Sequence, residues 1–231
     1  MIPLRDNQKR ETFPLLTLTL VALNVLIFLW DRQWHPFRPS VVFADLSMRP
    51  FDVVESLHSL REHDPNANLF SFVTVLTSLF IHGSPAHILG NMIFLLVFGP
   101  GVEEAIGGPR FALYYIAWGI AAATAQIYVD PGSSVPTIGA SGAIGGVLGA
   151  YLLLFPGNKI QIYVPMFIFL SFAVSAWVLL GFWFLWQIFI PQNGIANWAH
   201  VGGFLAGMLT VLVMGGPRAI LKGRYPDKEV A

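Results

Sequence analysis

Long apolar runs without charged residues alternate with shorter polar segments along the 231-residue chain. A helix needs about 20 mainly apolar residues to cross a bilayer. The runs therefore predict six transmembrane helices, which we place at residues 13–30, 86–102, 111–129, 141–155, 165–190 and 196–214. The segment Pro191-Gln192-Asn193-Gly194 is typical of a turn and separates the last two helices. Residues 70–81 are expected to form an apolar approach to the second helix.

The polar segments divide the chain into one membrane domain with a tail at each end. The predicted fold class is an all-α, polytopic six-helix bundle comprising residues 13–216, with tails at residues 1–12 and 217–231. Residues 31–69 form a long first loop that carries both signs of charge and several prolines, including Pro36 and Pro65. We expect this loop to be external and associated with the membrane surface.

The composition indicates that lipid surrounds most of the chain. Only 11% of the residues are charged and 55% are hydrophobic, with a mean hydropathy of +0.64. Soluble domains usually carry about 25% charged residues. The net charge of zero and the pI near 7 give no sign of a nucleic-acid partner. The absence of cysteine from the sequence excludes disulfides and thiolate metal sites.

The distribution of lysine and arginine predicts the orientation, because cytoplasmic loops are enriched in these residues. An even number of helices places both tails on one side. The basic residues on that side are Arg5, Lys9, Arg10, Arg110, Lys159, Arg218, Lys222, Arg224 and Lys228. In the first loop, on the other side, acidic residues outnumber the arginines. Both termini are therefore expected to face the cytoplasm.

Three polar motifs lie where the even-numbered helices are predicted to begin. His87 and Asn91 open the second helix within HGSPAHILGNM. Ser141 opens the fourth within GASG, and His200 opens the sixth within NWAHVGG. These helices all begin at the outer side, so a hydroxyl, two imidazoles and an amide are predicted at one depth. Ionisable groups inside a membrane are costly, which makes them candidates for function.

Glycine spacing predicts which of these helices touch. Small residues four apart let helix backbones approach closely in lipid, and both the fourth and the sixth helix have them. The glycines that we expect to support the site by packing are Gly139, Gly142, Gly145, Gly146, Gly203 and Gly207. Contact between the two helices would bring Ser141 within about 2.6–3.2 Å of His200, the separation that a nucleophile and its base need.

The same arrangement predicts a site for a developing anion. A helix that begins at Ser141 would point free N–H groups outward. Asn91 follows His87 by one helical turn on the same face, so both side chains could donate to that anion. The only carboxylates expected near the outer layer are Asp130 and those of the first loop. A serine–histidine dyad without a third, acidic member is therefore predicted.

The motifs HGSPAHILGNM, GASGAIGGVLGAYLLLFP and AHVGGFLAG resemble the rhomboid family of intramembrane serine proteases, over nearly all six helices. G-x-S-G alone is a weak signal, but three motifs in this order, each opening an even-numbered helix, are a strong one. The resemblance implies that Ser141 is the nucleophile and His200 the general base. It also implies that His87 and Asn91, with the Ser141 backbone N–H, line the oxyanion hole.

One further segment resembles the family, and two positions depart from its pattern. GVEEAIGG resembles its G-x-x-x-E-x-x-x-G turn, with Glu103 at the acidic position. Gly145 departs from it, because many relatives carry an aromatic residue there that packs against the histidine. Trp198 or Phe204 is expected to hold the His200 ring instead. The Trp-Arg pair often found in the first loop of relatives is absent from this sequence as a dipeptide.

The resemblance implies an intramembrane serine endopeptidase that cleaves transmembrane segments of other membrane proteins near the outer face. Helical peptide bonds are already hydrogen-bonded, so cleavage needs local unwinding and favours glycine or proline near the cut. The resemblance adds a preference for small side chains there. Water is expected to reach Ser141 through a cavity open to the outside, with the loop near Gly194 as its cover. The expected partners are such substrates and the lipid bilayer of a bacterial inner membrane, with no nucleic acid, cofactor or metal.

Three other classes of protein compete with this interpretation. A metal- or haem-binding protein would use His82, His87 and His200, but the sequence has no HExxH motif and no carboxylate accompanies these histidines. A transporter would favour a repeated half-structure with helices broken at mid-membrane. The sequence shows no such repeat, and its polar groups are predicted near one face. A catalytically inactive relative would only bind transmembrane segments, against which the presence of both Ser141 and His200 argues. His82 is interpreted as loop structure or as support for His87, and Gln187 as an interhelical hydrogen bond.

Overall fold

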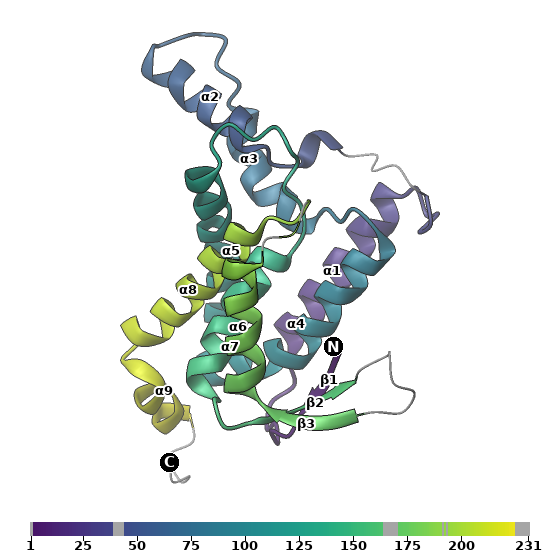
Figure 1. Ribbon diagram of the computed structural model, residues 1–231, viewed down its shortest axis with the longest axis vertical. Helices are drawn as coiled ribbons and strands as arrows, with labels where there is room; N and C mark the ends of the chain where they lie inside the picture. The colour runs from purple at the N-terminus through teal and green to yellow at the C-terminus, as the bar shows by residue number, and fades with distance from the viewer. Residues whose placement is uncertain (1, 39–43, 164–170, 191, 193, 225–231) are drawn as a thin grey trace.

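The computed structural model describes residues 2–38, 44–163, 171–190, 192 and 194–224, and its helices pack side by side with a small sheet at one end (Figure 1). The long helices are α1 (Leu15–Asp31), α4 (Pro85–Ile106), α5 (Gly108–Val129), α6 (Ser141–Leu154), α7 (Ala176–Phe189) and α8 (Asn197–Val213). The shorter ones are α2 (Pro50–Arg61), α3 (Phe70–Thr77), α9 (Gly216–Arg224) and the 3-10 turns Ala44–Leu46 and Ser78–Phe80. The strands β1 (Ile2–Asp6), β2 (Lys159–Tyr163) and β3 (Ser171–Ser175) lie at the same end as α9, opposite α2.

Two helices are long and apolar enough to cross a membrane on their own. These are α4 and α5, with 22 residues each, and a third span results if α8 and α9, bent by 66° at their junction, are taken together. Helices α1, α6 and α7, and α3 with its following turn, are apolar but shorter. Among the described residues, two or three spans are therefore clear, and the count of six stays a prediction.

Five of the six predicted transmembrane segments coincide with helices α1, α4, α5, α6 and α8 to within a few residues. The predicted fifth helix, residues 165–190, is wrong at its start, because α7 begins only at Ala176 and residues 171–175 are strand β3. Residues 165–170 of that prediction lie outside the described residues. The short apolar run before Ala176 was assigned to a helix by its hydropathy alone, which does not distinguish strand from helix.

A three-stranded antiparallel sheet contradicts the all-α prediction. Its strand order is β1-β2-β3, with Lys159 opposite Ser175 and Tyr163 opposite Ser171. The sequence KIQIY of β2 alternates polar and apolar residues, and only its two isoleucines are buried, which is the period of a half-buried strand. Residues 2–6, predicted to be part of a tail, pair with β2 as strand β1.

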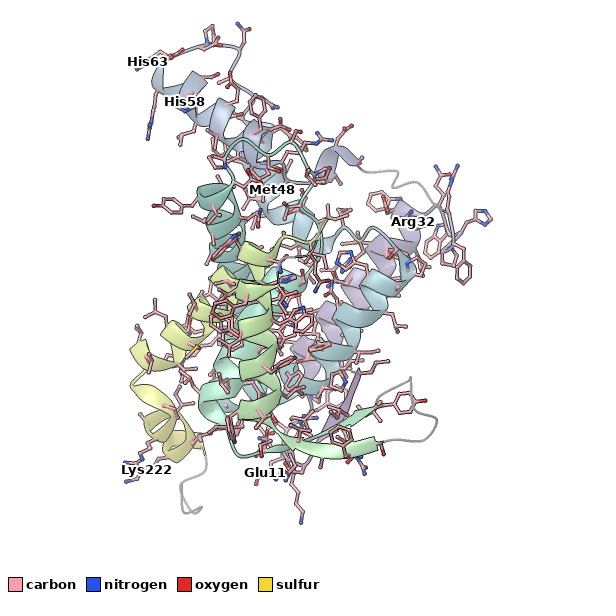
Figure 2. The ribbon with its side chains drawn as sticks, in the orientation of Figure 1. Glu11, Arg32, Met48, His58, His63 and Lys222 are labelled. Atoms are coloured by element: carbon pink, nitrogen blue, oxygen red, sulfur yellow. The ribbon has the colours of Figure 1, made fainter. Side chains whose placement is uncertain are left out.

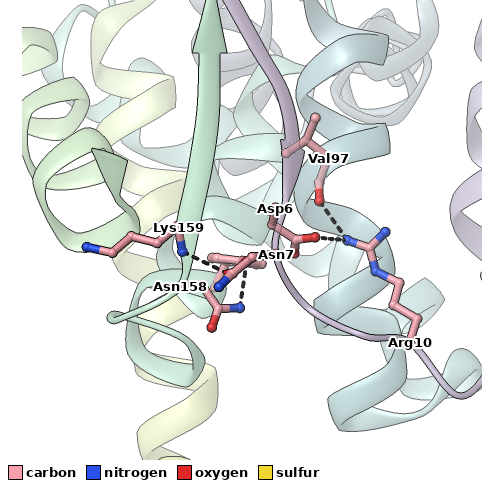
Figure 3. A network of polar contacts seen from close by, with 7 residues as sticks. Asp6, Asn7, Arg10, Val97, Asn158 and Lys159 are labelled. Carbon is pink, nitrogen blue, oxygen red and sulfur yellow. Dashed lines mark hydrogen bonds and ion pairs between the residues drawn. The ribbon is translucent and has the colours of Figure 1, made fainter. Parts of the chain in front are cut away.

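Polar contacts fix the first strand against the helices (Figure 3). Arg10 forms an ion pair with Asp6 at 2.9 Å and donates to the carbonyl oxygen of Val97 in α4 at 3.1 Å. The Tyr151 hydroxyl of α6 donates to Asp6 at 2.7 Å and accepts from the Asn158 amide at 3.1 Å. The N-terminal segment is thus part of the folded domain and joins α4 to the end of α6.

Glu103 of α4 caps the start of α1. Its carboxylate accepts from the backbone N–H groups of Leu16 and Thr17 at 2.9 and 2.8 Å, and from the Thr17 hydroxyl at 2.7 Å. The first N–H groups of a helix have no intrahelical acceptor and favour negative charge, so a carboxylate suits this position. A Cβ at Gly99 would lie 3.0 Å from Thr17, and Gly107 ends α4 with a φ of +87°. The G-x-x-x-E-x-x-x-G segment therefore joins α4 to α1.

Helix α6 lies at the centre of the bundle and contacts α8 backbone to backbone. A Cβ built at Gly203 would lie 2.0 Å from the Gly142 carbonyl oxygen, and one at Gly207 would lie 1.9 Å from that of Gly146. Real Cβ atoms essentially never come closer than 3.0 Å to an atom of a neighbouring helix. The predicted contact between these two helices is present, and it requires glycine at both α8 positions.

The glycines of α6 serve two neighbouring helices, whereas their spacing predicts contact with α8 alone. Gly142 and Gly146 leave room for α5, since a Cβ there would lie 2.6 Å from Ala122 and 2.4 Å from Trp118 respectively. Gly149 leaves room for α8 instead, because its Cβ would lie 2.0 Å from the carbonyl oxygen of Phe204. Helix α6 thus packs closely against both α5 and α8, which also touch each other at Gly202.

The first loop projects from the end of the bundle away from the sheet. His58 and His63, at the end of α2, lie far from Lys222 of α9, which is near the sheet end (Figure 2). The loop is attached to the segment before α6 through Met48, which is buried. The backbone of Met48 exchanges hydrogen bonds with that of Thr137 at 2.7 and 3.3 Å. The association of the loop with the membrane surface stays a prediction.

Candidate active site

Ser141 and His200 lie in direct contact. Ser141 is the first residue of α6, and His200 lies in the first turn of α8. The distance from the Ser141 Oγ to the His200 Nε2 is 2.8 Å. Both side chains come to one point because the glycine contacts between α6 and α8 remove the usual gap between helices. This distance lies within the range that a nucleophile and its base need.

The other side of the His200 ring contacts α7. The Gln187 Oε1 lies 2.7 Å from the His200 Nδ1, and the Trp183 ring lies 5.7 Å from the imidazole, centroid to centroid. The sequence predicts an interhelical hydrogen bond for Gln187 without indicating its partner. It also predicts that Trp198 or Phe204 holds the imidazole. Trp198 is 40% exposed, and Phe204 packs on Trp183 at 6.0 Å.

Gly145 lacks an aromatic side chain because α8 occupies the space. A Cβ at this position would lie 2.9 Å from the backbone carbonyl oxygen of His200 and 3.3 Å from the Phe204 nitrogen. Both atoms belong to the helix backbone and cannot turn aside as a side chain would. The ring that packs on the imidazole therefore comes from Trp183 of α7, and not from α6.

His87 and Asn91 lie one turn apart on α4, next to the loop that leads into Ser141. The Ser84 hydroxyl accepts from the His87 backbone N–H at 3.1 Å and caps α4. Gly139 has a φ of +110°, which favours glycine. A Cβ there would lie 2.7 Å from the His87 Nε2 and 3.4 Å from the Asn91 Nδ2. The absence of a side chain at Gly139 brings the backbone before Ser141 against both polar groups.

His82 contacts the candidate site directly, although its place in the sequence predicts only loop structure or support for His87. It is fully buried, and its Nδ1 lies 3.3 Å from the Phe80 carbonyl oxygen. A carbonyl can only accept, so Nδ1 carries the proton and Nε2 accepts, from the Asn91 amide at 3.0 Å and the Ala140 N–H at 3.5 Å. Burial, and to a smaller extent the nearby His87, lowers the pKa of His82 to about 3, so the ring is neutral.

Arg32, at the end of α1, holds the segment that carries His82. Its guanidinium is fully buried and donates to the carbonyl oxygens of His82 at 3.0 Å and of Gly83 at 2.6 Å. It also donates to the Arg38 carbonyl oxygen at 2.6 Å. A planar guanidinium presents five donors in a fixed arrangement, which suits several carbonyls at once. The sequence gives no sign that Arg32 anchors the turn at His82, because no motif links α1 to this turn.

A cavity of about 570 Å³ lies beside Ser141 and His200. The polar side chains that line it include Ser141, His200, His87 and Asn91. Its apolar lining includes Trp183, and Gly194 lies at its wall. The loop expected to cover the site thus contributes to the cavity, although residues 191 and 193 lie outside the described residues. Within the part of the chain that the structure describes, no group of three or more His, Cys, Asp or Glu residues could hold a metal ion.

The family model of the Rhomboid domain matches residues 69–217, which include all of these side chains except Arg32 and Arg38. The chain therefore belongs to the rhomboid family, and with its apolar helices it is an integral membrane protein. It is 34% identical over 145 residues to the rhomboid protease GluP of Bacillus subtilis, covering 63% of this chain and 26% of GluP.

Two further relatives show how much of the chain the likeness covers. Rhomboid-related protein 2 of Mus musculus is 29% identical over 201 residues, or 84% of this chain and 60% of that protein. The putative rhomboid protease YdcA of Bacillus subtilis is 34% identical over 145 residues, or 59% of this chain and 66% of YdcA. The chain thus spans about a quarter of the length of GluP and three fifths of the mouse protein.

Proposed function

We propose that this rhomboid protein is an intramembrane serine endopeptidase that uses Ser141 as nucleophile and His200 as general base. The observation that carries the proposal is the 2.8 Å contact between the Ser141 Oγ and the His200 Nε2 at the wall of a 570 Å³ cavity. The names of GluP and YdcA, which call them proteases, support the same activity.

In the proposed reaction, the Ser141 hydroxyl gives its proton to the His200 Nε2 while Oγ attacks a substrate carbonyl carbon. The carbonyl oxygen becomes an anion, which the side chains of His87 and Asn91 and the Ser141 backbone N–H stabilise. The C–N bond then breaks, and His200 returns the proton to the leaving amine. A water molecule entering through the cavity hydrolyses the acyl-serine ester by the same steps, with His200 again as the base.

The depth of the site follows from the length of α6 in this proposal. Its 14 residues span about 21 Å, less than the roughly 30 Å hydrocarbon core. A short helix is tolerated here because nearly all of α6 is buried in protein and the cavity lies at its first residue. Six crossings, by α1, α4, α5, α6, α7 and α8, would then place Ser141 below the outer surface.

The proposed substrates are transmembrane segments of other proteins, with residues that weaken a helix and small side chains near the cut bond. The proposed location is a bacterial inner membrane, with both ends of residues 13–216 facing the cytoplasm and the cavity opening to the outer side. The position of β1 and α9 at one end of the bundle supports an even number of crossings.

The test is labelling of the purified, detergent-solubilised protein with a fluorescent fluorophosphonate, together with cleavage of a model transmembrane substrate. We expect wild type to react at Ser141, and the Ser141→Ala and His200→Ala variants to lose both labelling and cleavage. If folded wild-type protein neither labels nor cleaves, the protease proposal is wrong, and an inactive relative that only binds transmembrane segments becomes the better account.

A further inference from the structure

We propose that Gln187 of α7 is a positioning residue for His200, and that Asn197 sets the direction in which the Gln187 amide points. This inference rests on the proposed function, since it concerns how the proposed general base is held. It replaces the predicted two-residue dyad by a chain of four side chains, Ser141, His200, Gln187 and Asn197, which come from α6, α8, α7 and α8.

The base needs one particular tautomer. To take a proton from Ser141, the His200 Nε2 must present its lone pair, so Nδ1 must carry the hydrogen. That N–H needs an acceptor, which the Gln187 Oε1 provides at 2.7 Å. Gln187 is only 8% exposed, so water competes little for this bond. An acceptor at Nδ1 therefore favours the tautomer that serves as a base.

Two backbone groups determine which way the Gln187 amide points. The Gln192 N–H, which can only donate, faces the Asn197 Oδ1 at 3.3 Å. The Gln187 carbonyl oxygen, which can only accept, faces the Asn197 Nδ2 at 3.3 Å. The Asn197 amide is therefore oriented without reference to any other side chain. Its Nδ2 also lies 3.2 Å from the Gln187 Oε1, so it donates there and keeps that oxygen, not the amide nitrogen, toward His200.

A neutral acceptor suits this place better than the carboxylate of a serine protease triad. Burying an unpaired carboxylate in an apolar environment is costly, and more so within a membrane. An amide oxygen fixes the tautomer without that cost. Because Trp183, which packs on the imidazole, is also part of α7, both contacts that hold the ring depend on α7 being packed against α8.

The experiment compares three variants at the two amide positions with a matched control. Gln187→Met keeps the size of the side chain and removes the acceptor, whereas Gln187→Glu keeps an acceptor oxygen in either charge state. Asn197→Asp keeps the shape of its side chain but loses the donor that orients Gln187. Gln126→Met makes the same change on α5, outside the residues that line the cavity. Each is assayed for cleavage of a model transmembrane substrate, for labelling rate and for thermal unfolding.

We expect Gln187→Met to lower kcat about ten- to a hundredfold with KM nearly unchanged, because the hydrogen bond acts on the base and not on the substrate. Gln187→Glu should recover most of that loss, and Asn197→Asp should lower kcat in the same way. Gln126→Met should match wild type. A role limited to packing predicts little loss in Gln187→Met, because methionine keeps the size of the side chain, and so leaves nothing for Gln187→Glu to restore.

The inference is overturned if wild type is active and Gln187→Met retains its kcat, or if Gln187→Glu is no better than Gln187→Met. Should Gln187→Met unfold, the nearly isosteric Asn197→Asp variant decides, and unchanged kcat in that variant overturns the inference. Failure of the proposed function is a separate result, in which wild type itself neither labels nor cleaves.

Discussion

The backbone contact between α6 and α8 makes Gly207→Ala a sensitive perturbation of both stability and activity. The new Cβ would lie 1.9 Å from the Gly146 carbonyl oxygen, and the next nearest atoms, at 2.6 and 2.8 Å, are also backbone atoms of Gly146. No side chain can turn aside to make room. The helices must separate until the contact reaches at least 3.0 Å, a movement of about 1.1 Å.

That movement has two consequences of known size. Overpacking of a filled interior costs about 1–3 kcal/mol of the free energy of unfolding. If α8 moves as a rigid rod, the 2.8 Å contact between Ser141 and His200 lengthens by up to the same 1.1 Å, to about 3.9 Å, beyond hydrogen-bond distance. A misplacement of about 1 Å at the reacting groups lowers the rate about a hundredfold.

The measurement pairs thermal unfolding in detergent, followed by circular dichroism, with the rate of fluorophosphonate labelling. Gly181→Ala on α7 is the matched control, because a Cβ built there has no described atom within 4 Å apart from its chain neighbours and its own helix backbone. It should be neutral or stabilising by up to about 1 kcal/mol, since alanine favours the helix. The reasoning about helix contact is refuted if Gly207→Ala unfolds and labels like Gly181→Ala.

Two further predictions concern the groups that hold α4 in place. Glu103→Ala leaves the N–H groups of Leu16 and Thr17, the second of them buried, without their acceptor. The free energy of unfolding should therefore fall by about 2–4 kcal/mol in thermal or denaturant unfolding, and wild-type stability would contradict the proposed cap. His82→Leu removes the acceptor of the Asn91 amide, so kcat for a model substrate should fall about tenfold with KM nearly unchanged; an unchanged kcat would show that Asn91 is held by other contacts.

Much of the fold could be predicted from the pattern of apolar residues along the chain. The apolar runs located α1, α4, α5, α6 and α8 to within a few residues, because a helix in lipid must satisfy its own backbone and therefore reads as a continuous apolar segment. The strands were missed because a short apolar run fits either a buried strand or a helix, and the pairing that decides lies outside the run. Residues 2–6 become a strand only because β2, more than 150 positions later, offers them a partner.

Part of the candidate site could likewise be predicted from the sequence, and part could not. Glycine spacing and the three polar motifs predicted the contact between Ser141 and His200, because repeated glycines indicate close backbone contact between α6 and α8. Gln187, by contrast, was seen only as one more polar residue in an apolar helix. Its distance from His200 depends on how α7 rotates and docks on α8, which no local pattern specifies.

The sequence by itself determined most of the apolar helical segments, which two of them touch, and which side chains could carry the chemistry. These properties follow from residue type and spacing, and each needs only a helix and its nearest neighbour. Only the tertiary structure decided the hydrogen bonds that support these side chains. Arg32 bonds the turn before α4, His82 bonds Asn91, and Gln187 bonds His200. Such hydrogen bonds join residues from separate elements, and their directions exist only after those elements have packed.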